Sequence, residues 1–179
     1  MSVLLETLSN LTAFLEGVGV DYMVLGGFAL PFYGRIRSTL DLDVTAKILS
    51  EESFDQLVSS SRSFGFYPTL CKYENPVCVL VDEETQLEVE LWIRPDGVEW
   101  DEETLRRRNH FTVGDVSFWV ISPEDFIVSK LARPDRMVQD ELDVKSVLVR
   151  MNSRLDEEYL EFRARKFGVY VLLEEIRKR

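Results

Sequence analysis

The sequence predicts an α/β (α+β) fold with a mixed sheet of about five strands, flanked by helices and followed by a helical C-terminal portion. Short apolar or alternating runs, typical of strands, recur between residues 22 and 120. Stripes at helical spacing lie before and between them, and the pattern from residue 122 onward is helical. We therefore expect a core at residues 1–121 and a helical portion at 122–179, packed together as a single structural unit.

The N-terminal elements are a helix, a strand and a second, short helix. Apolar residues recur at helical spacing over residues 2–16, and Gly17-Val18-Gly19 ends that helix. The run Tyr22 to Leu25 is an apolar strand that ends in the tight turn Gly26-Gly27. We expect the short helix next, with Pro31 in its first turn.

The middle of the chain alternates between strand and helix. A strand carries the two acids of Leu40 to Thr45, and Ser50 then caps a helix over 51–64. Residues 77–81 form an apolar strand, and residues 86–94 alternate between an apolar and a polar face. The polar face of the latter strand carries Glu88, Glu90 and Trp92.

The remaining elements are a short helix at 101–108, a hairpin at 111–120 and four C-terminal helices. Ser122 caps the first of these helices, and Pro134 opens the second. The last two helices fall within residues 156–179.

Composition limits the classes of partner. The net charge of −11 argues against strong non-specific binding to nucleic acid, although residues 150–179 hold eight Lys/Arg and six Asp/Glu. The apolar runs are shorter than the ~18 residues of a membrane helix, and the N-terminus lacks the basic region of a secretory signal. We expect a cytoplasmic protein without a membrane partner.

Cys71 and Cys78 match no zinc spacing, and we expect both as reduced thiols.

Asp41 and Asp43 are the strongest candidates for chemistry. Residues two apart on a strand share one face and lie roughly 6.5 Å apart at Cα, so the two carboxylates can converge on a divalent ion. Acids are depleted from strands, so a plain acidic face is unusual. Gly26 and Gly27 allow close approach of the backbone, and free N–H groups at a helix start suit phosphate. Together these features indicate a triphosphate site beside a metal site.

The pattern Gly26-Gly27-x-Ala29-Leu30, followed by Arg37-x-Thr39-x-Asp41-x-Asp43, resembles nucleotidyltransferases of the DNA polymerase β-like superfamily. Within it, the chain is most similar to AbiEii-type and minimal nucleotidyltransferases, several of which are toxins of toxin–antitoxin pairs. Weaker likeness extends from Ser122 to Asp143. The resemblance implies transfer of an NMP from an NTP to an acceptor hydroxyl. It also implies Mg2+, or alternatively Mn2+, bound by the two acids and a third on a later strand.

The resemblance makes Glu90 the third metal ligand, because members carry an acid between two apolar residues at this place. Glu88 shares the face and is the alternative. Two carboxylates so close repel unless a cation lies between them. The family more often has Asp here, and the longer Glu leaves the metal geometry open. An ordinary exposed strand face is the non-functional alternative.

Four further residues are implied to bind the nucleotide. Gly27 stands where many members carry Ser, so phosphate contact must come from backbone N–H groups. Arg37, which precedes the acids with Thr39, either pairs with phosphate or balances Asp41, and Arg35 is the weaker candidate. Lys130 matches a helix lysine near the triphosphate, although exposed helix lysines without such a role are common.

Arg136, Asp140 and Asp143 are spaced i, i+4, i+7, and the resemblance implies that they line the cleft from one helix face. The alternative is an ordinary Arg–Asp pair worth only about 0.3–0.5 kcal/mol.

His110 is the only histidine, and the chain has no Ser or Cys nucleophile motif, which argues against a triad. We expect the tryptophans in a core or interface rather than as base-stacking platforms.

Three functions stay open. The first is a metal-dependent nucleotidyltransferase that uses an NTP and acts on tRNA, protein or a small molecule, with an antitoxin as partner if the chain is a toxin. The second is a phosphatase, since Asp41 to Thr45 fits D-x-D-x-T, although Arg37-Ser38-Thr39 stands where an apolar strand is required; D-x-D also occurs in glycosyltransferases. The third is a catalytically silent nucleotide- or partner-binding protein of the same fold.

Overall fold

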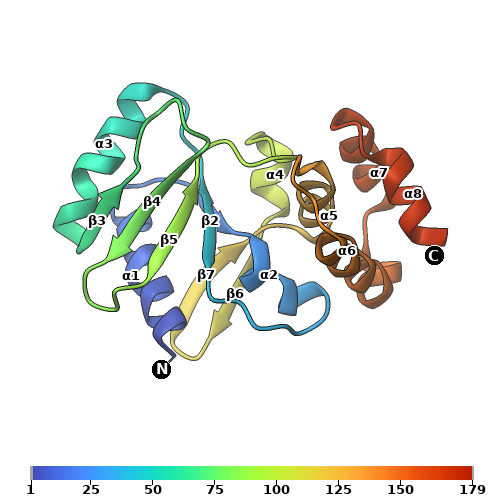
Figure 1. Ribbon diagram of the computed structural model, residues 1–179, viewed down its shortest axis with the longest axis horizontal. Coiled ribbons are helices and arrows are strands. Elements are labelled where there is room, and N and C mark those ends of the chain that lie inside the picture. Colours follow the sequence, from blue (N-terminus) through green and yellow to red (C-terminus); the bar gives the residue numbers. More distant parts are fainter. Residues whose placement is uncertain (1, 179) are drawn as a thin grey trace. The chain divides into compact units, whose positions relative to one another are not determined.

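A computed structural model describes residues 2–178 (Figure 1). The chain divides into two compact units, which we describe separately. Unit 1 comprises Met1–Phe28, Thr39–Pro95 and Asn109–Val120, and unit 2 comprises Ala29–Ser38, Asp96–Arg108 and Ile121–Arg179.

Unit 1 is built on a seven-stranded mixed sheet in the order β3-β4-β5-β2-β1-β7-β6. The strands β1 and β7 pair parallel, as do β2 and β5, and the other pairs are antiparallel. The strand bounds are Tyr22–Val24 (β1), Leu42–Ala46 (β2), Phe66–Thr69 (β3), Val77–Asp82 (β4), Glu88–Trp92 (β5), Asn109–Val113 (β6) and Val116–Val120 (β7).

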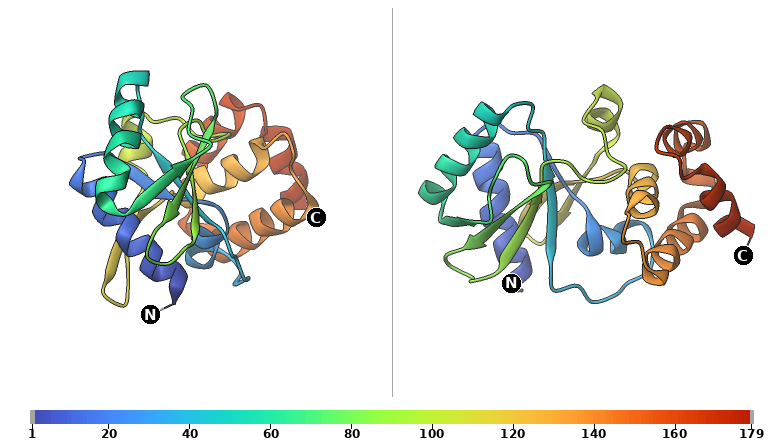
Figure 2. Two further views of the ribbon diagram at one scale, coloured as in Figure 1. Left: turned by 60° about the vertical axis from the view of Figure 1, so that its left-hand side comes forward. Right: turned by 45° about the horizontal axis from the view of Figure 1, so that its top comes forward.

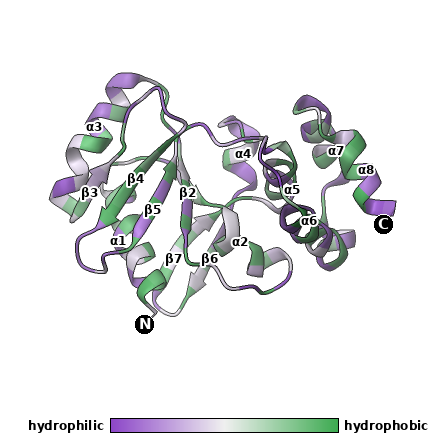
Figure 3. Cartoon of the chain, in the orientation of Figure 1, coloured by the Kyte–Doolittle hydropathy of each residue, from purple (hydrophilic) through white to green (hydrophobic). Residues whose placement is uncertain are grey.

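Helices α1 (Val3–Gly17) and α3 (Glu51–Ser61) cover one face of this sheet (Figure 2). A 3-10 turn, Arg62–Phe64, follows α3 and ends at Gly65, which has φ +80°. Hydrophobic residues run along β4, whereas much of α3 is hydrophilic (Figure 3). The core of the unit comes from α1 and the central strands, and the following apolar side chains are fully buried: Leu8, Leu11, Phe14, Leu42, Val44, Val89 and Leu91.

The sheet has more strands than the five or so expected, and β3 was not expected at all. Pro68 lies inside β3, and Tyr67 beside it is exposed, so the segment lacks the usual signature of a strand. It pairs only with β4, at the edge of the sheet, where a residue without an N–H group is tolerated.

Helix α2 (Gly26–Tyr33) begins at the first glycine rather than after a two-glycine turn. Gly26 has φ +65° and so makes the turn out of β1 by itself. Pro31 is consequently the sixth residue of the helix, and its expected place in the first turn is wrong. The strand β2 begins at Leu42, so Leu40 lies before it and is exposed instead of sharing its buried face.

The two cysteines form a disulfide, so the expectation of reduced thiols is wrong. Cys71 lies just after β3, and Cys78 is the fully buried second residue of β4. Their Cα atoms are 4.4 Å apart because the antiparallel pairing of β3 and β4 brings the two segments together. The sequence spacing alone does not reveal this pairing.

Unit 2 is helical apart from its connecting segments. Its helices are α4 (Glu102–Arg107), α5 (Pro123–Ala132), α6 (Val138–Met151), α7 (Glu157–Lys166) and α8 (Tyr170–Lys178), with a 3-10 turn at Asn152–Arg154. The Ser122 hydroxyl caps α5 as expected. Helix α6, however, begins at Val138 and not at Pro134, because the carboxylate of Asp140 accepts the Met137 N–H at 3.0 Å and fixes the first turn there.

A buried arginine joins α4 to α7 within unit 2. The guanidinium of Arg163 is 1% exposed and donates to Asp101 Oδ1 at 2.7 Å, Thr104 Oγ1 at 2.8 Å and the Tyr159 hydroxyl at 2.8 Å. These contacts satisfy a charge that would otherwise be expensive to bury. Among residues 2–178, none of the helices combines the length and hydrophobicity needed to span a membrane.

Candidate active site

Two carboxylates adjoin each other in the middle of the sheet of unit 1. Asp43 lies on β2 and Glu90 on β5, and the parallel register places them directly opposite one another. Both are half-buried, and they belong to the same polar face of the sheet. Alternation along each strand sends their neighbours Leu42, Val44, Val89 and Leu91 to the buried face.

The surroundings of Glu90 favour its protonated form, and the pKa of this carboxyl group lies above its ordinary value. Burial raises the pKa of Glu90, and the charge of Asp43, the hydrogen bond with Asp43 and the charge of Asp41 raise it further. A hydrogen bond from Trp92 acts in the opposite direction. A divalent cation beside the pair would stabilise both ionised forms, so the two side chains fit such a ligand.

Gly26 explains how the backbone comes close to this pair. A Cβ atom at this position would lie 1.9 Å from Asp43 Oδ2 and 2.6 Å from its Cγ. Any side chain here would therefore collide with the carboxylate, and the φ of +65° would strain it as well. The start of α2 therefore lies directly against the Asp43 carboxylate. A phosphate site at this helix start and a metal site beside it stay predictions.

Asp41 and Glu88 lie at the margin of this arrangement. Asp41 is exposed and precedes β2, and its carbonyl accepts from the Thr39 hydroxyl at 3.3 Å. Glu88 is exposed at the start of β5, so the acid that adjoins Asp43 is Glu90. In residues 2–178 no group of three or more Asp, Glu, His or Cys side chains is arranged so that it could hold a metal ion. The structure thus presents a pair of carboxylates and not a closed triad.

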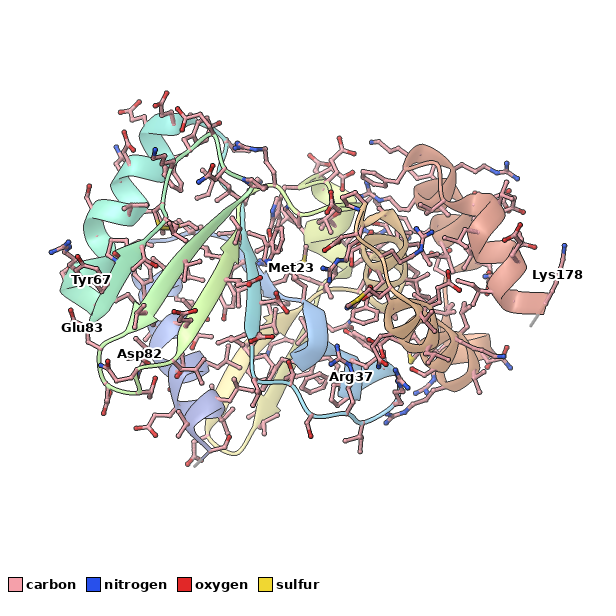
Figure 4. All side chains as sticks on the ribbon, viewed as in Figure 1. Met23, Arg37, Tyr67, Asp82, Glu83 and Lys178 are labelled. Atoms are coloured by element: carbon pink, nitrogen blue, oxygen red, sulfur yellow. A yellow bond between two sulfur atoms is a disulfide. The ribbon has the colours of Figure 1, made fainter. Side chains whose placement is uncertain are left out.

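A second set of charges lies within unit 2, and we call it the charged cluster: Arg35, Arg37, Lys130, Asp140 and Asp143. The Lys130 ammonium is 2.9 Å from Asp140 Oδ1 and 4.0 Å from Asp143 Oδ2. Asp143 is fully buried and also accepts from Arg35 Nη2 at 2.8 Å and Arg37 Nε at 3.3 Å. Arg37, labelled in Figure 4, lies in the segment after α2.

The charged cluster bears on three residues chosen from the sequence. Lys130 is buried and so is not the exposed helix lysine of the non-functional alternative, and Arg37 pairs with Asp143 rather than balancing Asp41. Arg136 precedes α6, so it does not share a helix face with Asp140 and Asp143, and this expectation is wrong. Its guanidinium instead donates to the Leu131 carbonyl at 2.7 Å.

Burial raises the pKa of Asp140, but the hydrogen bonds from the Met137 N–H and from Lys130 outweigh it and hold the pKa below its ordinary value. Asp140 is therefore an ionised partner for Lys130 and a cap for α6 at once. This double role accounts for an acid that is almost fully buried.

Sequence reasoning missed two features of these sites. Arg35, the weaker candidate, makes two hydrogen bonds with Asp143, at 2.9 Å and 2.8 Å. Trp92, expected as a core or interface residue, donates its indole N–H to Asp43 Oδ1 at 3.2 Å. The signal for Trp92 was its place on the polar face of β5, two residues from Glu90. His110 packs against Trp119 in the hairpin of β6 and β7, with ring centroids 4.8 Å apart and the two rings tilted at 59°.

The mixed sheet, with paired acids on neighbouring strands beside a glycine that opens a helix, defines a nucleotidyltransferase-like fold. Solved structures with this fold match between three quarters and nearly all of the chain. An antigenic nucleotidyltransferase-like protein from Paracoccidioides brasiliensis has 17% identity and a TM-score of 0.58, covering 98% of this chain and 92% of its own. For the antibiotic-resistance factor ANT(2'')-Ia the identity is 14% and the TM-score 0.58, with coverages of 97% and 95%. The lincosamide antibiotic adenylyltransferase LnuA, bound to lincomycin, has 13% identity and a TM-score of 0.51, covering 76% and 91%.

The chain belongs to the family described as "Nucleotidyl transferase of unknown function (DUF2204)", whose pattern matches residues 4–176. Comparison with curated proteins gives no significant match. The narrower resemblance to AbiEii-type proteins stays a prediction.

Proposed function

We propose that this protein is a metal-dependent nucleotidyltransferase that moves an NMP from an NTP to an acceptor hydroxyl. The observation that carries the proposal is the contact between Asp43 and Glu90 on two parallel strands beside Gly26. Adjoining carboxylates are uncommon on a sheet unless they serve a cation. Family membership supports the same class of reaction.

Asp43 and Glu90 would hold Mg2+, or Mn2+, with Asp41 turning toward them as the third ligand. A bound ion would supply charge stabilisation at the phosphates and would lower the pKa of an attacking oxygen. Backbone N–H groups at Gly26 and Gly27, which open α2, would bind the triphosphate, because no side chain can fit at Gly26. In the segment that leads to Asp41, Arg37 and Thr39 are further candidates for phosphate contact.

Within unit 2, the contacts of Lys130 and Asp140 favour an indirect role. Lys130 is already paired with Asp140, and both lie against Asp143, which holds Arg35 and Arg37. We propose that Lys130, Asp140 and Asp143 hold the side chains of Arg35 and Arg37, which precede Asp41 in the sequence, in fixed positions. Direct nucleotide contact by Lys130, Arg136 or Asp140 stays a prediction.

The test is transfer of label from each α-labelled NTP in the presence of Mg2+ and either total RNA, cell lysate or a candidate small molecule. Asp43→Ala and Asp41→Ala should each lower transfer by at least about 100-fold. Asp115→Ala, at the exposed hairpin turn of the same unit, is the matched control and should leave transfer unchanged. Full activity of both site variants would overturn the proposal.

The acceptor can be tRNA, a protein or a small molecule, and a toxin acting on the first two would have an antitoxin partner. One observation favours a small cationic acceptor. Unit 1 holds 4 Lys/Arg and 15 Asp/Glu, whereas unit 2 holds 17 of each, so the whole net charge belongs to the unit with the carboxylate pair. Two structural neighbours are described with lincomycin and with adenylyl-2''-tobramycin, and both antibiotics are suitable first acceptors to test.

A specific observation also favours a second candidate, a catalytically silent nucleotide-binding protein of this fold. Asp41 is exposed, and residues 2–178 contain no ready group of three acids for a metal. Calorimetry that finds NTP binding without turnover on any acceptor would support it. The structure argues against the phosphatase alternative, because β2 begins after Asp41 and so does not present that residue as a nucleophile.

A further inference from the structure

Trp92 is the last residue of β5 and shares the polar face of that strand with Glu90. Its indole Nε1–H donates to Asp43 Oδ1 at 3.2 Å across to β2, although the residue paired with Trp92 in the register is Thr45. The side chain therefore leans back along β2 toward the carboxylate pair. It is half-buried, in contrast to the fully buried residues on the other face of β5.

The hydrogen bond leaves Asp43 a single orientation. Oδ1 is engaged by Trp92, and Oδ2 lies where a Cβ of residue 26 would stand, 1.9 Å from that position. The carboxylate is thus fixed between an indole N–H on one side and the start of α2 on the other. Glu90 lies directly opposite Asp43 in the register of β2 and β5, so the acid that the indole holds is the one that adjoins Glu90.

The chemistry of indole suits this task. Its N–H is a donor only, so it cannot act as a metal ligand or accept a proton from the pair. It occupies one lone pair of Asp43 Oδ1 without competing for a cation, and the remaining lone pairs of the two carboxylates stay available. Groups that orient metal ligands in this way commonly change metal affinity by about 10–100-fold when they are removed.

We propose that Trp92 is a positioning residue that holds Asp43 beside Glu90 in the geometry for a divalent cation. The proposal rests on the proposed function, since it assumes that the pair binds metal. It goes further by assigning the orientation of Asp43 within the pair to one indole N–H group.

The test compares binding of Mn2+ alone, by calorimetry, to the full-length wild type and to Trp92→Phe, which keeps an aromatic ring but lacks the N–H. We expect the Kd for Mn2+ to rise by about 10–100-fold and NMP transfer to recover at higher Mn2+. Trp92→Gln, whose amide N–H lies at the same number of bonds from Cα, should restore part of the affinity. Trp119→Phe, half-buried on β7 of the same unit, is the control and should bind Mn2+ as the wild type does.

A second measurement does not depend on substituting Trp92. In a Trp100→Phe/Trp119→Phe double variant Trp92 is the only tryptophan, and paramagnetic Mn2+ should quench its fluorescence with the Kd found by calorimetry. Unchanged Mn2+ affinity in Trp92→Phe, or no quenching at saturating Mn2+, would overturn the role of Trp92 while leaving the proposed function intact. Failure of the wild type to bind Mn2+ would overturn both.

Discussion

Asp125 is a buried acid of unit 2 whose protonation should be visible in the stability of the protein. It is 1% exposed and accepts from the Ser122 and Tyr159 hydroxyls, each at 3.0 Å, with Arg163 Nε at 3.6 Å. Burial raises the pKa of Asp125 to about 6, and the charge of Arg163 and the two hydroxyls only partly oppose this effect. As the pH rises above 3.8, the ordinary pKa, the unfolded chain releases the proton of Asp125, whereas the folded state keeps it until the pH reaches about 6.

The sign of the pH dependence follows from this difference. The contribution of Asp125 is fully present below the unfolded pKa and is lost as the pH rises through the folded pKa. We expect the free energy of unfolding of the wild type, minus that of Asp125→Asn, to fall by on the order of 3 kcal/mol between about pH 4 and pH 7. Denaturant titrations at several pH values measure it.

The control for this measurement is Asp135→Asn. Asp135 is exposed, and its hydrogen bond with Arg133 lowers its pKa, so its difference curve should be flat or slope the other way. A wild-type minus Asp125→Asn difference that rises with pH would contradict the assignment.

Gly26 permits a matched comparison with another glycine of unit 1. Both Gly26 and Gly114 have positive φ, +65° and +60°, but a Cβ would strike Asp43 only at Gly26. Gly114→Ala should therefore lose about 1–2 kcal/mol of stability from backbone strain alone, with unchanged NMP transfer. Gly26→Ala should lose more stability and nearly all transfer, because the carboxylate must move. Equal effects of the two changes on transfer would show that the contact with Asp43 is unimportant.

At the scale of elements, the disulfide ties the end of β3 to β4 across a loop of about seven residues. In the chain-entropy account, closing a loop of this length stabilises the fold by about 2 kcal/mol. Reduction should therefore lower the free energy of unfolding by roughly that amount. A Cys71→Ser/Cys78→Ala variant should not respond to reductant, which makes it the control. Two thiols that titrate in the unreduced, denatured protein would show that the bond is not formed.

The elements themselves divide into those that local patterns predict and those that they do not. Apolar spacing, Ser50 and Ser122 were enough to predict α3 and α5, because helix caps and periodicity are local properties. The predicted start of α6 was wrong because Asp140 fixes the first turn by accepting the Met137 N–H group. The carboxylate of Asp140 is held in place by a hydrogen bond from Lys130 on α5. Rules based on neighbouring residues favoured Pro134 as the helix start, and such rules do not include a contact with a lysine on another helix.

The candidate site shows the same division. Residue type and alternation were enough to choose Asp41 and Asp43, whereas the choice of Glu90 over Glu88 came from the family resemblance. The placement of Asp43 opposite Glu90 depends on the register of β2 and β5, which are separated by 41 residues of sequence. Register over such a separation is set by the whole sheet. The indole contact from Trp92 depends on the same register and was missed for the same reason.

At the scale of the molecule, the net charge is divided unequally between the units. Unit 1, with 4 Lys/Arg against 15 Asp/Glu, repels polyanions, and the balanced charge of unit 2 offers little compensation. We expect non-specific binding of labelled RNA, measured by anisotropy, to be weaker than a Kd of ~10⁻⁴ M at physiological salt. Micromolar binding that weakens steeply with added salt would contradict this, and would point to RNA as the acceptor.

The strand β2 is the fourth of seven, with bonded neighbours on both sides. Since side chains alternate along a strand, sliding β2 by a single step would drive Asp43 into the apolar interior and present Leu42 or Val44 to Glu90. Central strands of a sheet tolerate insertions and deletions poorly, and a pair of site residues on such strands is disrupted by the same changes. Changes in chain length near this centre should therefore be all-or-none in effect, whereas the edge strand β6, which pairs on one side only, should tolerate them better.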